Sequence, residues 1–118
     1  MIRHQCYQVT CNPGTWDDAL TACQLQGARL GRITDSVVND WVAQQNGGRI
    51  WISATYVMAE GTWLDADGNC LMLANWAQVQ PNNLSNNQDC GTLNFNARGF
   101  WDDRPCTDIF PCYVCETR

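Results

Sequence analysis

Side chains that offer oxygen atoms gather in the second half of the chain, with few basic residues between them. They form one group around a proline and one directly after a tryptophan: Gln80, Asn82, Gln88, Asp102 and Asp103. Calcium is a hard cation that takes oxygen ligands from carboxylates, amide carbonyls and water. Pro81, between two donors, could fix their relative direction. The pattern predicts a calcium site, but Asn and Gln also populate solvated loops and the spacing is not that of an EF-hand, so both interpretations stay open.

The cysteines indicate an oxidising compartment. The chain has 8 cysteines and 1 histidine in 118 residues, which favours disulfides. A zinc site is the rival interpretation, because Cys112 and Cys115 have the spacing of a zinc knuckle, but no second ligand pair accompanies them. A thioredoxin-like motif is also excluded, since this pair ends the chain instead of opening a helix. Eight cysteines can pair in many ways, so their number does not determine which cysteines are bonded.

Length and charge narrow the function classes. The chain is long enough for one domain over residues 1–118, without repeats or linkers. Its net charge of −5 argues against nucleic acid and anionic membranes as partners. No apolar run approaches the length of a membrane span, and the first residues lack the apolar core of a signal peptide, so a secreted protein of this kind would be a mature chain. With one histidine and no free cysteine beside it, the expectation is a binding protein and no enzyme.

Two helices are expected in the first half of the chain. Thr15 has the features of an N-cap, and Gly27 provides a stop for the helix between them. A second helix follows Asp35 and ends before Gly47. Its apolar face would be formed by Val37, Val38, Trp41 and Val42.

Short strands and one long loop are expected in the second half. The strand-like segments are 50–55, 62–64, 91–96, 99–102 and 113–116. Helices followed by strands indicate an α+β domain. Residues 66–89 show no clear periodicity, and a connection of this length is usually functional or disordered. Trp63, Trp76, Cys70 and Cys90 lie near its ends, which favours an ordered, function-bearing loop.

Short motifs along the whole chain point to one family. They are Cys6-Tyr7, Trp16 with Ala19 and Cys23, Trp51-Ile52-Ser53-Ala54, Glu60-Gly61 with Trp63, Asn75-Trp76, Gln80-Pro81-Asn82, Trp101-Asp102-Asp103-Arg104-Pro105-Cys106 and Val114-Cys115-Glu116. Each is weak alone, but in this order and spacing the chain resembles a C-type lectin domain. The resemblance implies a disulfide-stapled α+β fold, in which two helices flank short antiparallel sheets and a long ordered loop carries the binding site.

The same resemblance implies a disulfide framework. Cys23 would pair with Cys115, tying the first helix to the last strand, and Cys90 would pair with Cys106 across the binding region. Such a framework implies a secreted, extracellular protein.

Four cysteines lie outside that framework: Cys6, Cys11, Cys70 and Cys112. A bond between Cys11 and Cys112 is conceivable if the first and last strands lie side by side, as the family fold implies. Cys6 or Cys70 could then join two subunits in a homodimer.

The resemblance also implies how a sugar would bind. The five donors Gln80, Asn82, Gln88, Asp102 and Asp103 would hold one calcium ion, and all of them except Asp103 would also contact sugar hydroxyls. Two carboxylates, where mannose-binding members have three, predict weaker calcium affinity. Gln80 facing Asp102 reverses the usual Glu facing Asn, which favours galactose or N-acetylgalactosamine over mannose. The Gln-Pro-Asn triplet matches neither standard motif, so the sugar itself stays open.

Calcium-dependent glycan binding is therefore the leading hypothesis, with two alternatives. A C-type-lectin-like domain can bind a protein ligand instead, although such members usually lose the calcium ligands. An ice-binding relative is the third class, and the lack of threonines in the loop argues against it. Four tryptophans are expected in the core: Trp16, Trp51, Trp63 and Trp76. Trp101 is expected to pack as well, which would position Asp102 and Asp103.

Overall fold

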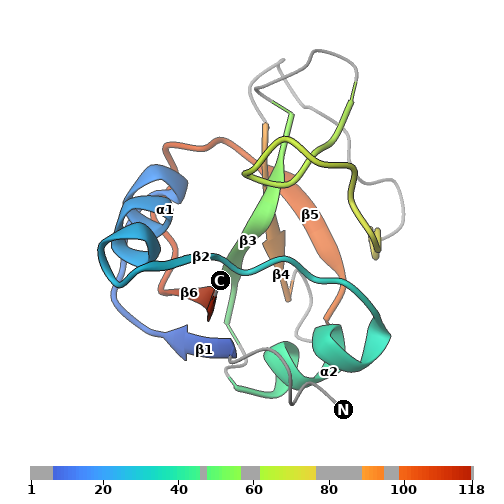
Figure 1. The fold of residues 1–118 in the computed structure, drawn as a ribbon, viewed down its shortest axis with the longest axis horizontal. Helices are drawn as coiled ribbons and strands as arrows, with labels where there is room; N and C mark the ends of the chain where they lie inside the picture. Colours follow the sequence, from blue (N-terminus) through green and yellow to red (C-terminus); the bar gives the residue numbers. More distant parts are fainter. Residues whose placement is uncertain (1–6, 46–47, 57–61, 77–88, 95–98, 118) are drawn as a thin grey trace.

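The computed structural model describes residues 7–45, 48–56, 62–76, 89–94 and 99–117. Figure 1 shows the elements in these ranges. In chain order they are β1 (Tyr7–Thr10), α1 (Trp16–Leu25), β2 (Ala28–Leu30), α2 (Ser36–Gln45), β3 (Ile50–Thr55), β4 (Cys90–Leu93), β5 (Trp101–Arg104) and β6 (Cys112–Thr117).

The strands form one mixed sheet in the order β1-β6-β3-β4-β5, with β2 also paired to β6. Strands β3 and β6 run parallel, and the other pairs are antiparallel. Helix α1 packs against β2 and β6, whereas α2 lies at the other end of β2, beside β1 (Figure 1). The chain's first and last described strands are therefore neighbours, and β5 is the last strand in the order at the opposite end of the sheet.

Local capping explains the first helix, as the sequence predicts. The Asp18 amide donates to Thr15 Oγ1 at 3.1 Å, and the Thr15 amide donates to Asp18 Oδ2 at 3.0 Å. These two bonds form a capping box that satisfies N–H groups left open at the helix start. Gly27 follows the helix with φ of 74°, a backbone conformation that glycine adopts without strain.

The second helix is confirmed, but one residue of its predicted apolar face is wrong. Asp35 Oδ1 accepts from the Val38 amide at 2.9 Å and caps the helix start. Val37 points outward and is 55% exposed, whereas the polar Asn39 is buried. Asn39 Oδ1 accepts from Trp101 Nε1 at 2.7 Å. Apolar periodicity could not find Asn39, because its burial depends on a partner far along the chain.

Four of the five predicted strands are present with shifted ends. Segment 50–55 is β3, and segments 91–96, 99–102 and 113–116 overlap β4, β5 and β6. Strand β4 ends at Leu93 because Asn94 has φ of 72°, which is outside the extended region. Strands β1 and β2 were not among the predicted segments, since neither shows a run of strand-favouring residues between turn signals.

The predicted strand 62–64 is wrong. Only Leu64 pairs, through single bridges to Thr55 and Cys70. Directly afterwards, Asp65 Oδ1 accepts from the amides of Asp67 and Asn69 at 2.9 and 3.0 Å, which turns the chain away from the sheet.

Three disulfides staple the described part of the chain. The bonds Cys23–Cys115 and Cys90–Cys106 confirm the framework implied by the resemblance. Cys11–Cys112 is also formed, with Cα atoms 4.0 Å apart on neighbouring strand ends. Cys70 is free and exposed. Cys6 lies outside the described residues, so its pairing and the predicted homodimer are untested.

The core has one cluster on each face of the sheet. Ile50, Ile52 and Trp101 lie in the first, and Trp16 and Trp51 lie in the second. This division follows from the alternation of side chains along β3. The predicted burial of Trp16 and Trp51 is confirmed. The other two tryptophans predicted for the core are partly buried and pack against the first cluster: Trp63 and Trp76.

Candidate functional site

The two described ends of the long loop lie beside β5. On one side, the Trp101 amide donates to the Asn75 carbonyl at 2.8 Å, and Trp76 forms a bridge with Trp101. On the other side, β4 pairs with β5 from Cys90 to Leu93, directly after Asp89. The predicted donors Gln80, Asn82 and Gln88 lie outside the described residues. The chain segment that carries them therefore begins and ends next to the strand that carries Asp102 and Asp103.

A row of aromatic rings supports β5 at this end. The ring centroids of Tyr56 and Trp63 are 5.5 Å apart, those of Trp63 and Trp76 are 4.8 Å apart, and those of Trp76 and Trp101 are 5.4 Å apart. Trp101 is buried and also donates to Asn39. The prediction that Trp101 packs in the core is confirmed, and this packing fixes the start of β5.

The sheet register places Asp102 in a row of buried side chains. Trp51 pairs with Thr92, and Thr92 pairs with Asp102. Both carboxylate oxygens are engaged: Oδ1 accepts from the Thr92 hydroxyl, and Oδ2 lies 3.1 Å from the Arg49 guanidinium. Sequence reasoning missed both partners of Asp102. Thr92 faces Asp102 through the register of β4 and β5, and Arg49, directly before β3, reaches it through an ion pair, and neither relation is visible in a linear pattern.

The surroundings of Asp102 act on its charge in two directions. Only 2% of Asp102 is exposed, and this burial raises the pKa of its carboxyl group. The Thr92 hydrogen bond and the positive charges of Arg49 and Arg104 lower the pKa, while neighbouring Asp103 raises it. The ion pair with Arg49 therefore offsets part of the free-energy cost of burying the charged carboxylate.

Asp103 lies on the opposite face of β5, since successive side chains of a strand alternate. It is 1% exposed and pairs in register with Gly91. A Cβ at Gly91 would lie 2.9 Å from the Cβ of Ala54, so β3 and β4 pack closely at this point. The structure brings the two predicted carboxylates onto one strand but directs them to different faces.

The described donors fit calcium in type, with one condition. Carboxylate oxygens are the ligands that a hard cation prefers. The condition is the charge of Arg49, which lies 3.1 Å from Asp102 Oδ2 and would repel a cation bound to the same carboxylate. Among the described residues, no group of three or more His, Cys, Asp or Glu side chains is arranged to hold a metal ion. The predicted set contains only two residues of these types.

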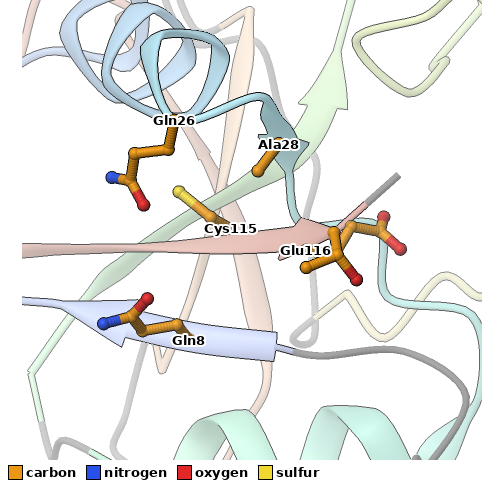
Figure 2. A pocket seen from close by; sticks show the side chains of 6 residues that line it. Gln8, Gln26, Ala28, Cys115 and Glu116 are labelled. Carbon is orange, nitrogen blue, oxygen red and sulfur yellow. The ribbon is translucent and has the colours of Figure 1, made fainter.

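A small pocket lies far from this strand in the sheet order. It has a volume of about 130 Å³ and lies where β1, β2, β6 and the end of α1 meet. Figure 2 shows Gln8 and Gln26 on either side of Cys115. Glu116 also lines this pocket, and its carboxylate is bound to Arg32, with Nε–Oε1 at 2.7 Å and Nη2–Oε2 at 3.3 Å. Neither of the predicted calcium ligands that the structure describes, Asp102 and Asp103, lines this pocket.

Comparison with known proteins decides the family. The model of the lectin C-type domain matches residues 12–117. This chain belongs to the C-type lectin domain family. The predicted fold is confirmed with it, since the carbohydrate-recognition domain of cow CD23, solved in the presence of a GlcNAc2Man3 oligosaccharide, superposes with a TM-score of 0.87. That likeness covers 95% of this chain and 86% of the other, at 25% identity.

Two relatives of this C-type lectin domain are similar in sequence. A perlucin-like protein of Mytilus galloprovincialis is 32% identical over 117 residues, covering 93% of this chain and 74% of the mussel protein. Lectin BRA-3 of Megabalanus rosa is 32% identical over 105 residues, covering 86% of this chain. The chain spans 64% of the barnacle lectin's length, so these relatives extend beyond the part that is shared.

Proposed function

We propose that this domain binds glycans through one calcium ion held beside β5, with galactose or N-acetylgalactosamine preferred to mannose. The observation that carries the proposal is the arrangement around Trp101. Both described ends of the loop flank the strand that presents Asp102 and Asp103. Membership of the C-type lectin domain family and the oligosaccharide named for the cow CD23 structure support a glycan as the ligand.

The proposed ligand set joins two carboxylates with three amides: Asp102, Asp103, Gln80, Asn82 and Gln88. An ion held by both carboxylates would lie at the edge of the sheet, because their side chains leave opposite faces of β5, the last strand in the order. A bound calcium ion would supply a Lewis-acidic centre for two neighbouring sugar hydroxyls. The side chains would set the sugar preference, because carboxylates only accept hydrogen bonds, whereas an amide also offers two N–H donors. Asp102 would accept from a hydroxyl and Gln80 would donate to one. This pattern is the basis for preferring galactose-type stereochemistry.

We also propose that the protein acts outside the cell. Three disulfides favour an oxidising compartment. Among the described helices, none is long and apolar enough to cross a membrane. Glycans or glycoconjugates are the proposed partners, and the proposed role is binding without a chemical reaction.

The test is retention of the disulfide-intact protein on immobilised galactose and mannose, in calcium and then in EDTA. We expect retention on galactose with calcium and elution by EDTA. Asp103→Asn should weaken binding roughly tenfold, because ligand charge tunes calcium affinity. Asp67→Asn is the matched control, since Asp67 forms its ion pair with Arg29 elsewhere on the surface.

Other outcomes would redirect the proposal. Elution that ignores EDTA would contradict the calcium-dependent mechanism. Stronger retention on mannose would overturn the sugar preference alone. A failure to bind either resin or calcium would reject the proposed function in favour of a protein ligand.

A further inference from the structure

The small pocket between β1, β2, β6 and the end of α1 arises because the helix stops before it covers the whole sheet face. Helix α1 ends shortly before Gly27, whose φ of 74° turns the chain into β2. On the strands beneath, Cys115 pairs with Gln8, and Thr117 pairs with Ala28. Paired side chains, and those two apart in a strand, share a face. These four side chains therefore lie on the face that α1 covers only in part.

The pocket combines an apolar floor with a polar rim. Ala28 and Cys115 form the floor and are 8% and 4% exposed. The Cys115 sulfur is bonded to Cys23, so the floor carries no thiol. Gln8 and Gln26 are exposed, and Figure 2 shows them on either side of Cys115, with their amide groups directed toward the strand between them. Within the described ranges, neither side-chain amide is hydrogen-bonded to another residue.

The described lining offers no charge to a ligand. Glu116 lines the pocket, but its side chain is fully buried. Both of its carboxylate oxygens accept from Arg32, with Nε–Oε1 at 2.7 Å and Nη2–Oε2 at 3.3 Å. A charged ligand would lose water without gaining an opposite charge, which is costly. The lining therefore favours a neutral ligand.

The size and hydrogen-bonding groups of the pocket match an acetamido group. The volume of about 130 Å³ has room for about four water molecules, or for a group of about four non-hydrogen atoms. An acetamido group is of this size and carries a methyl group, an N–H donor and a carbonyl acceptor. Each glutamine amide has both donors and an acceptor. One glutamine can accept from the acetamido N–H while the other donates to its carbonyl, and the methyl group then lies on the apolar floor.

We propose that this pocket binds the acetamido group of a neutral ligand through Gln8 and Gln26. The inference uses no metal ion and no residue of β5, so it goes beyond the proposed function and does not depend on it. A group this small makes few contacts, and a Kd in the millimolar range follows.

The experiment is a nuclear magnetic resonance titration of the isotope-labelled, disulfide-intact protein in EDTA. The probes are the methyl glycoside of N-acetylglucosamine, methyl glucoside and N-acetylalanine methylamide. Both acetamido probes should shift the side-chain amide signals of Gln8 and Gln26 and the backbone amide of Ala28. Methyl glucoside, which lacks the acetamido group, should not. The tighter of the two acetamido probes identifies the source of the group as an amino sugar or an acetylated peptide.

Three variants and one control test the assignment of the pocket. Gln8→Ala and Gln26→Ala should each weaken binding about fivefold, because each removes one hydrogen bond to the ligand. Gln24→Ala is the matched control, since Gln24 is an exposed glutamine of the same helix and does not line the pocket. It should leave the affinity unchanged. Ala28→Val should abolish binding while both glutamines stay in place, because the added methyl groups fill the floor.

Several results would overturn the inference. They are an absence of shifts with both acetamido probes, equal shifts with methyl glucoside, equal losses in Gln24→Ala and Gln26→Ala, and unchanged binding in the Gln8→Ala/Gln26→Ala double variant. None of these bears on the proposed function, because the titration contains no free calcium. Conversely, failure to bind galactose with calcium would reject the proposed function and leave this pocket untouched, since galactose has no acetamido group.

Discussion

In the part of the chain that the structure describes, two buried carboxylates are each paired with a partly exposed arginine, one on the inner strand β6 and one on β5, the last strand in the sheet order. Glu116 on β6 pairs with Arg32, and Asp102 on β5 pairs with Arg49. The two arginine side chains have similar exposure, at 27% and 21%. The chemistry of the two pairs is alike, so any difference in their contribution comes from the residues and strands around them.

The Glu116 pair is held from several directions. Oε1 accepts from both the backbone amide and Nε of Arg32, and Oε2 accepts from Nη2. Strand β6 is paired with β1, β2 and β3 and carries two disulfide cysteines, Cys112 and Cys115. This pair lies where the first and last described strands meet, so its loss should destabilise that part of the sheet.

The Asp102 carboxylate accepts from fewer groups than that of Glu116. Asp102 receives one hydroxyl and one guanidinium, on the last strand in the sheet order and next to the ends of the loop. Among the described strands, β5 pairs with β4, whereas β6 pairs with three others, so loss of the Asp102 pair should disturb less of the sheet. The same kind of ion pair is therefore held by several strands at Glu116 and by fewer contacts of the sheet at Asp102.

The largest predicted effect is at the enclosed pair. Glu116→Gln should lower the free energy of unfolding by about 3 kcal/mol, because it removes one partner of a buried ion pair. Urea unfolding with disulfides intact measures the change. Calcium and galactose binding by the folded fraction should stay unchanged. A loss no larger than that of Asp67→Asn, at the exposed pair with Arg29, would break the comparison.

A smaller loss of stability is expected at the Asp102–Arg49 pair. Thr92→Val keeps the shape of the side chain but removes the hydroxyl that donates to Asp102 Oδ1. The free energy of unfolding should fall by about 1–2 kcal/mol, since a buried oxygen loses its donor while Arg49 stays. The same urea series provides the value. A loss equal to that of Glu116→Gln would show that the two ion pairs contribute equally to stability.

The smallest effect concerns pH near the enclosed pair. Tyr7 donates to the Arg32 carbonyl, and burial together with the charge of Glu116 raises the pKa of its phenol above 10.0. The unfolded chain then loses this proton first as the pH rises. The stability from Tyr7 is therefore complete below the unfolded pKa and is lost as the pH rises through the folded pKa.

Tyr7→Phe tests this assignment. It should lower stability by about 1 kcal/mol at neutral pH and remove the late step from an ultraviolet titration of the tyrosines. Retention of the late step in Tyr7→Phe would assign it to another tyrosine.

Much of the fold followed from local signals. Thr15, Asp18 and Gly27 carry the first helix in a few neighbouring residues, so the sequence predicted it. The segment 62–64 and the position of Val37 were misjudged, because turn bonds at Asp65 and the distant partner of Asn39 override the local pattern.

The candidate site was only partly predictable, because contacts between residues that are distant in the sequence leave no local pattern. Asp102 and Asp103 were predicted because they directly follow Trp101 in a short motif, which is a local signal. Thr92 reaches Asp102 through strand register and Arg49 reaches it through an ion pair, and both relations are properties of the folded sheet. A reader of the sequence had no means of pairing them.

The most direct test of the account is nuclear magnetic resonance of isotope-labelled native protein during addition of calcium and then galactose. The backbone amides of Thr92 and Asp102 and the side-chain N–H groups of Arg49 should shift. The corresponding signals of Arg32 and Glu116 should stay in place. Shifts at Arg32 and Glu116, or none at Asp102, would contradict the assignment of binding to the β5 end of the sheet.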